Sequence, residues 1–153
     1  MHTSAGTIAL ENYLANQDAF LVEKIREAGA VILGKTNMTE LANGMSSEMW
    51  AGYSSRGGQT LNPYGDPTLF VGGSSSGSAV AVASNFSVLS IGTETDASIL
   101  SPATQNSVVG IKPTVGLVSR SGIIPFTYSQ DIAGPFARNV EDAAILLGFI
   151  DGY

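Results

Sequence analysis

Seven glycine and serine residues, 72–78, run without a break into the small apolar residues 79–83. This pattern predicts a polar loop that opens a tightly packed helix. At such a helix start the free backbone amides and the helix dipole both point outward, which is a geometry that binds anions. A flexible linker has a similar composition and stays open as an alternative, although a linker does not normally enter an Ala/Val helix that is followed by a strand.

The segments around this loop predict an α/β fold. Residues 18–29 open on Asp18 and close on Gly29, with apolar positions at helical spacing between them, as in a capped amphipathic helix. A second helix is predicted after the cap residue Asn139, where one face carries Val140, Ala143, Ala144 and Leu147.

Short apolar runs rich in β-forming residues predict buried strands. A long loop rich in Gly, Ser, Asn and aromatic residues covers residues 44–73. The order of elements favours a mixed, mostly parallel sheet covered by helices. The predicted strands are residues 30–34, 88–92 and 108–111.

Composition narrows the classes of function. The 153 residues fit one domain or part of one, and 13 acidic against 7 basic residues give a net charge of −6, which argues against nucleic acid as a partner. No cysteine is present, and His2 is the only histidine. Thiol catalysis and thiolate metal sites are therefore excluded, and we expect neither a cofactor nor a metal. No apolar stretch is long enough to span a membrane and no secretory signal is evident, so we expect a cytoplasmic protein.

Low charge also bears on partners. Charged residues make up 13% of the chain where about 25% is ordinary. Such a chain has little charge with which to cover a surface, so exposed apolar area and self-association are expected.

Residues 29–36 match the phosphate-binding loop pattern G-x-x-x-x-G-K-[ST] letter for letter. That mechanism needs a strand before the first glycine and a helix after the lysine, whereas here a predicted helix precedes Gly29. The intervening Ala-Val-Ile-Leu is typical of a buried strand. We therefore interpret the match as a helix C-cap followed by a core strand, with nucleotide binding as a minor alternative.

A turn of small residues after the strand at 88–92 carries Ser98. Backbone N–H groups in such a turn can form an oxyanion hole around a nucleophilic serine. From the residues alone, Ser98 as the cap of a helix over 99–104 is the better interpretation. A serine nucleophile also needs a base, and His2 stands at the start of the chain, which leaves only Lys24, Lys35 and Lys112.

Taken together, four motifs resemble the amidase signature family in order and spacing, and the match covers essentially the whole chain. Residues 130–138 continue the resemblance, and the Thr-Glu-Thr-Asp form of the serine turn is similar to the peptide-amidase-like branch. The four motifs are residues 34–41, 72–79, 92–99 and 109–114.

The resemblance implies hydrolysis of amide bonds by a Ser–cis-Ser–Lys mechanism. By position, Ser98 is the acyl-forming nucleophile and Ser74 the cis-configured serine that relays a proton. The oxyanion hole is then formed by the amides of Thr95, Asp96, Ala97 and Ser98.

Two positions depart from the family. Ala97 stands where the family has glycine, and a Cβ there disturbs a loop that needs glycine-like freedom. The family's catalytic lysine falls upstream of Met1, and Lys35 is a different lysine of the family.

We therefore expect residues 1–153 to be a single partial amidase domain that lacks the lysine-bearing N-terminal segment and the C-terminal part. Such a fragment carries the serine pair but is inactive alone. In the full-length family the partner is a small-molecule or peptide amide substrate. The alternative is a non-catalytic fragment that self-associates or complements a partner through exposed apolar surface.

Overall fold

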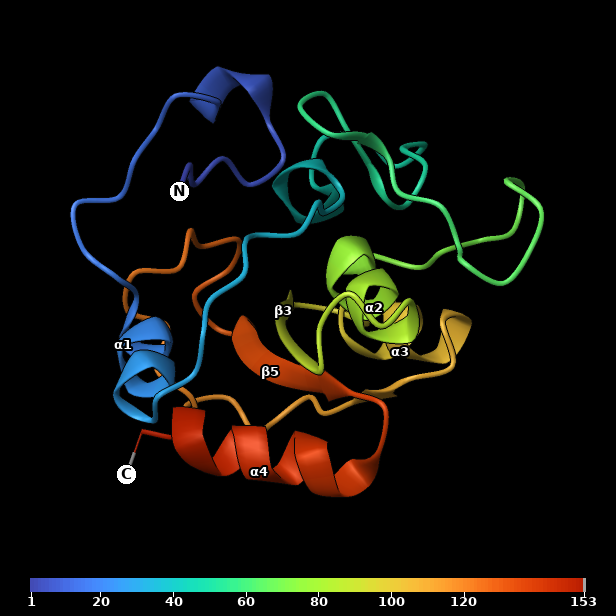
Figure 1. Cartoon of the computed structure of the whole chain (residues 1–153). Coiled ribbons are helices and arrows are strands. Elements are labelled where there is room, and N and C mark those ends of the chain that lie inside the picture. Colours follow the sequence, from blue (N-terminus) through green and yellow to red (C-terminus); the bar gives the residue numbers. More distant parts are fainter. Residues whose placement is uncertain (153) are drawn as a thin grey trace.

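A three-stranded sheet forms the centre of the computed structural model, which describes residues 1–152 (Figure 1). Strand β5 (Ile132–Ala137) lies between β3 (Leu89–Glu94) and β4 (Val109–Gly110). A separate hairpin joins β1 (Tyr53–Ser54) to β2 (Gly58–Gln59). The α/β class predicted from the sequence is confirmed.

Helices cover both faces of the sheet. The C-terminal helix α4 packs against β5 and against α1, while α2 packs against β3 and α3 against β4 (Figure 1). No helix among residues 1–152 combines the length and apolar character needed to cross a membrane. The helices are α1 (Phe20–Glu27), α2 (Ser76–Ala83), α3 (Leu100–Gln105) and α4 (Val140–Ile150), with short 3-10 helices at Ile8–Leu10 and Glu40–Asn43.

Strand β5 separates two apolar cores, and all six of its residues are buried. Burial on both faces explains why its sequence is apolar throughout instead of alternating. One core lies among α1, α4 and β5, and the other among α2, α3 and β5. The first contains Leu21, Val118, Ile132, Ala133, Leu146 and Ile150. The second contains Ala79, Val82, Ile99, Ala103 and Phe136.

The direction of the strands differs from the expectation. Both pairings of the sheet in residues 1–152, β3 with β5 and β4 with β5, are antiparallel. The predicted strand at 30–34 does not form, and Val31 and Leu33 are 81% and 73% exposed. A β-forming run joins a sheet only where a neighbouring strand supplies hydrogen bonds. Residues 30–38 instead form neither helix nor strand and run from the end of α1 to the 3-10 helix at Glu40–Asn43 (Figure 1).

The helix ends match the sequence in part. Gly29 closes α1 with φ +84°, as predicted, but Asp18 does not cap that helix. The N-cap is Ala19, and the Asp18 carboxylate instead accepts a hydrogen bond from Arg26 Nε at 2.7 Å. At α4 the predicted cap is confirmed, because the Asn139 side chain accepts from the Asp142 amide at 2.8 Å.

The buried face of α4 differs from the predicted one by part of a turn. Ala143, Leu146 and Ile150 are buried, whereas Val140 is 67% exposed. The helix is apolar around most of its circumference, so periodicity alone does not select a face. Contacts with β5 and α1 make that selection.

Candidate active site

Ser74 lies in the turn before α2, and the peptide bond between Gly73 and Ser74 is cis. The cis configuration implied by the resemblance is therefore present at this serine. Its side chain is buried, and its Oγ has no hydrogen-bond partner among residues 1–152. The Ser74 carbonyl accepts a hydrogen bond from the Thr39 amide at 3.0 Å.

Close packing explains the glycines of this loop. A Cβ on Gly72, which has φ +72°, would lie 2.6 Å from Pro102 Cα, and one on Gly77 would lie 2.4 Å from the Asn37 carbonyl oxygen. Only glycine fits where backbones approach so closely. Residues 72–75 are therefore a packed loop, residues 76–78 form the first turn of α2, and the linker interpretation is wrong.

Ser98 lies in the turn that connects β3 to α3, and it is buried. Its Oγ is 3.4 Å from the Asp96 carbonyl oxygen. Ser98 does not cap α3, whose N-cap is Ile99. The buried Glu94 carboxylate takes this role, because its Oε2 accepts hydrogen bonds from the amides of Ile99 at 2.7 Å and Leu100 at 2.9 Å.

Ser75 joins the two serine turns. Its hydroxyl accepts from the Thr93 amide and donates to the Thr93 carbonyl, both at 3.0 Å. Its own amide donates to the Ser98 carbonyl at 3.2 Å. The residue next to Ser74 is thus bonded both to the end of β3 and to Ser98. The Ser75 amide is thus used within the protein, and the Gly77 amide donates to the Asn37 carbonyl. Neither amide is therefore free to bind an anion.

A cavity of about 230 Å³ opens between the two turns. It brings together Ser74 and Ser98, which are 24 positions apart in the sequence, with Thr95 and Asp96 beside them. Ala97 belongs to the same turn but does not line the cavity. Within residues 1–152, the amides of 95–98 donate no hydrogen bond to the protein. The remaining lining residues are Ala42, Asn43, Gly73 and Phe126.

Asp131, a carboxylate that the sequence analysis missed, bonds to two residues that line this cavity. It accepts hydrogen bonds from the Thr95 hydroxyl at 2.6 Å and from the Phe126 amide at 2.6 Å. Burial raises the pKa of the Asp131 carboxyl, but hydrogen bonds from Thr95, Phe126 and Thr127 outweigh burial, so its pKa lies below the usual range. Glu94, Ser75 and Phe126 were also missed. An acidic residue shortly before a predicted helix was the one available signal, and it fits Asp96 as well as Glu94.

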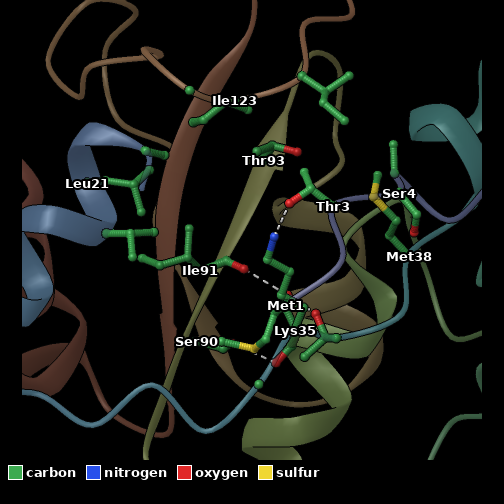
Figure 2. A pocket seen from close by; sticks show the side chains of 18 of the residues that line it. Met1, Thr3, Ser4, Leu21, Lys35, Met38, Ser90, Ile91, Thr93 and Ile123 are labelled. Carbon is green, nitrogen blue, oxygen red and sulfur yellow. Dashed lines mark hydrogen bonds between the residues drawn. The ribbon is translucent and has the colours of Figure 1, made fainter. Parts of the chain in front are cut away.

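The lysines lie elsewhere. Among residues 1–152, no lysine or histidine lines the 230 Å³ cavity. Lys35 lines a larger groove of about 2110 Å³, which shares Ala42, Thr95 and Phe126 with this cavity, and its ammonium donates to the Thr3 hydroxyl (Figure 2). Burial lowers the pKa of Lys35, although Asp18 acts in the opposite direction. Lys112 Nζ donates to the Pro113 carbonyl at 3.4 Å.

The phosphate-loop match at 29–36 lacks the required geometry. Helix α1 precedes Gly29, and extended chain follows Lys35. The predicted helix C-cap at Gly29 is confirmed by its position and φ, whereas the predicted core strand after it is not.

Ala97 has φ +56°, in the left-handed region. The left-handed conformation costs an L-residue roughly 1–2 kcal/mol, and the greater unfolded-state entropy of glycine offsets part of the gain on substitution. We therefore expect Ala97→Gly to raise the free energy of unfolding by about 0.5–1 kcal/mol, as measured by urea denaturation followed by circular dichroism. Asn85, with φ +59°, provides the control. Because asparagine tolerates this region, Asn85→Gly should gain less, and a loss of stability in Ala97→Gly would contradict the argument.

The lowered pKa of Asp131 predicts a pH dependence. Because the pKa is lower in the folded chain than in the unfolded one, the ionised carboxylate contributes stability above about pH 4, and this contribution is lost as pH falls through the folded-state pKa. The difference in unfolding free energy between the wild type and Asp131→Asn should be constant at neutral pH and shrink on acidification. Urea denaturation at a series of pH values measures it. If this difference in unfolding free energy instead grew toward low pH, the predicted direction of the Asp131 pKa shift would be wrong.

Comparison with known proteins identifies the family. The family model described as Amidase matches residues 1–153. A probable amidase of Arabidopsis thaliana is 51% identical over 100% of this chain and 30% of its own length. The crystal structure of a peptide amidase from Stenotrophomonas maltophilia is 57% identical, with a TM-score of 0.97 over 100% of this chain and 31% of its own.

A third relative is described as part of an amidotransferase. One component of the glutamyl-tRNA(Gln) amidotransferase of Thermotoga maritima is 44% identical, with a TM-score of 0.90 over 100% of this chain and 32% of its own. The chain thus spans about 30% of the length of the relatives it matches, which fits a partial amidase fold. Because the family model covers every residue of the sequence, the chain belongs to the amidase family.

Proposed function

We propose that the cavity between Ser74 and Ser98 is the site of carboxylic amide (C–N) hydrolysis. Ser98 Oγ attacks the amide carbonyl, the C–N bond breaks, and the amine leaves with a proton. Water then hydrolyses the acyl-serine. Ser74 relays protons between Ser98, the base and the leaving amine. The observation that carries this proposal is that Ser74 and Ser98 line one cavity, while Ser75 bonds both to the backbone of Thr93 and to the Ser98 carbonyl.

The turn at 95–98 supplies the electrostatic part of the mechanism. Backbone amides that are fixed in advance stabilise the oxyanion as it develops on the substrate carbonyl. The amides of Thr95, Asp96, Ala97 and Ser98 donate no hydrogen bond to other atoms of residues 1–152, which supports this role. Glu94 fixes the turn from behind by accepting the next two amides.

The reaction also needs a base that takes the Ser98 proton through Ser74. We assign this role to the lysine that the family carries upstream of the matched region. General-base catalysis contributes about 10²–10⁴-fold to the rate. Amide turnover by these 153 residues alone should therefore be lower by that factor than turnover by a chain that carries the lysine. The relatives described as amidases and a peptide amidase support a small-molecule or peptide amide as substrate. A cytoplasmic location belongs to the same proposal.

Labelling with a fluorophosphonate tests the nucleophile. We expect one adduct per chain by intact-mass analysis, lost in Ser98→Ala but changed little in Ser74→Ala, because the lysine to which Ser74 relays the proton is not among these 153 residues. Ala97→Gly should label faster than the wild type, since glycine relaxes the turn that carries the oxyanion donors.

Ser101→Ala is the matched control for this experiment. Ser101 lies three residues after Ser98 in α3, outside the cavity, and its substitution should leave labelling unchanged. An adduct that persists in Ser98→Ala, or a folded wild type that stays unlabelled, would contradict the assignment.

A second function is favoured by the 2110 Å³ groove, which we propose binds another polypeptide. Its lining includes strongly exposed apolar residues, and exposed apolar area of this kind marks interaction surfaces. Examples are Val31 at 81%, Leu33 at 73%, Phe86 at 75% and Val88 at 59%.

Association through the groove predicts a concentration-dependent mass. Sedimentation or light scattering should show oligomers whose share falls in Leu33→Ser, because this change removes exposed apolar area. Leu61→Ser is the control, since Leu61 is 46% exposed but does not line the groove. A monomer at all concentrations, with no binding of an apolar dye, would exclude this function.

A further inference from the structure

Phe126 is the one aromatic side chain in the lining of the serine cavity among residues 1–152. It belongs to an irregular connection before β5, and it is 51% exposed. The ring rests on Gly44, where a Cβ would lie 2.4 Å from Phe126 Cε2. An open apolar surface thus stands beside a polar cavity whose lining also includes Thr95, Asp96 and Ser98.

The antiparallel register places Asp131 beside this turn. Glu94 pairs with Ile132 as the last pair of the β3–β5 ladder, so the next residues, Thr95 and Asp131, meet just past its end. There the Thr95 hydroxyl donates to Asp131 Oδ1 at 2.6 Å. Asp131 therefore has a fixed position relative to the Ser98 turn.

The other oxygen of the same carboxylate holds the backbone of Phe126. Asp131 Oδ2 accepts from the amides of Phe126 at 2.6 Å and Thr127 at 2.9 Å, and Oδ1 also accepts from the Thr127 hydroxyl at 3.2 Å. One side chain therefore ties the ring-bearing segment to the turn that carries Ser98. Charge-assisted hydrogen bonds of this kind are among the stronger ones in proteins.

We propose that Phe126 is a specificity-determining residue that packs against the apolar part of the acyl group, and that Asp131 is the positioning residue that holds it there. The proposal rests on the proposed function for its account of the substrate. It assigns to the site amides whose acyl group carries an apolar chain, in preference to the shortest amides.

Labelling rates with two probes test the contact. A methyl and an octyl fluorophosphonate react with the same serine but differ in the apolar chain. In Phe126→Ala the octyl probe should lose about tenfold in labelling rate while the methyl probe changes little, because the lost contact is apolar. Asp131→Asn should shift the octyl-to-methyl ratio in the same direction.

The chain offers a matched control for Asp131. Asp66 accepts from the amide and hydroxyl of Thr68 at 2.8 and 2.7 Å, as Asp131 does from Thr127, but it lies outside the cavity. Asp66→Asn should leave the ratio unchanged. Equal slowing of both probes in Phe126→Ala or Asp131→Asn would indicate a merely structural role and overturn the proposal.

A second measurement keeps the proposal separate from the chemistry of Ser98. With 4-fluorophenylalanine at position 126, hexanamide should shift the fluorine NMR signal saturably and acetamide much less. The hexanamide effect should be lost in Asp131→Asn and kept in Asp66→Asn. Absence of labelling in a folded chain would contradict the proposed nucleophile alone, whereas a fluorine signal that is insensitive to hexanamide would overturn the role of Phe126.

Discussion

The β3–β5 ladder sets the geometry on which the candidate site depends. Its six pairs run from Leu89 with Ala137 to Glu94 with Ile132. A shift of one residue in this register would turn every side chain to the opposite face of the sheet. It would also separate Thr95 from Asp131, and with them the Ser98 turn from the segment that carries Phe126. The packing of Ile132 in one core and of Phe136 in the other therefore fixes the position of groups that lie beyond the end of β5.

Serine hydroxyls attach α2 to the exposed edge of this ladder. Ser75 bonds to the backbone of Thr93, Ser78 donates to the Ile91 carbonyl at 2.8 Å, and Ser90 donates to the Ser78 carbonyl at 2.7 Å. An edge strand carries unpaired backbone groups, and these hydroxyls satisfy several of them. The serines of the Gly/Ser run thus have different tasks. Ser75 and Ser78 bind β3, while Ser74 faces the cavity with no partner among residues 1–152.

The sequence predicted best those elements that are specified by neighbouring residues. The Asn139 cap and the glycine end of α1 depend on local hydrogen bonds and local φ, and they formed as predicted, whereas α2 begins at Ser76, three residues before the predicted start. Strand β5 was missed because Gly134 and Pro135 are typical of turns. The ladder between β4 and β5 is short. After the pair of Gly110 with Phe136, the next residue of β5 is Pro135, which has no N–H to donate. The run at 30–34 was overpredicted because β-propensity describes a residue and not a pairing.

The motifs by themselves determined the family, the α/β class and the candidates Ser74 and Ser98, because each depends on residue identity and spacing along the chain. Only the tertiary structure decided that the two serines share a cavity, and that Ser75, Glu94 and Asp131 hold its walls. The side chains of Ser75 and Glu94 bond to backbone groups, and Asp131 bonds to two backbone amides as well as to the hydroxyls of Thr95 and Thr127. A backbone acceptor or donor leaves no mark in the sequence, since every residue except proline offers both. Contacts of that kind become visible only when the strands have paired.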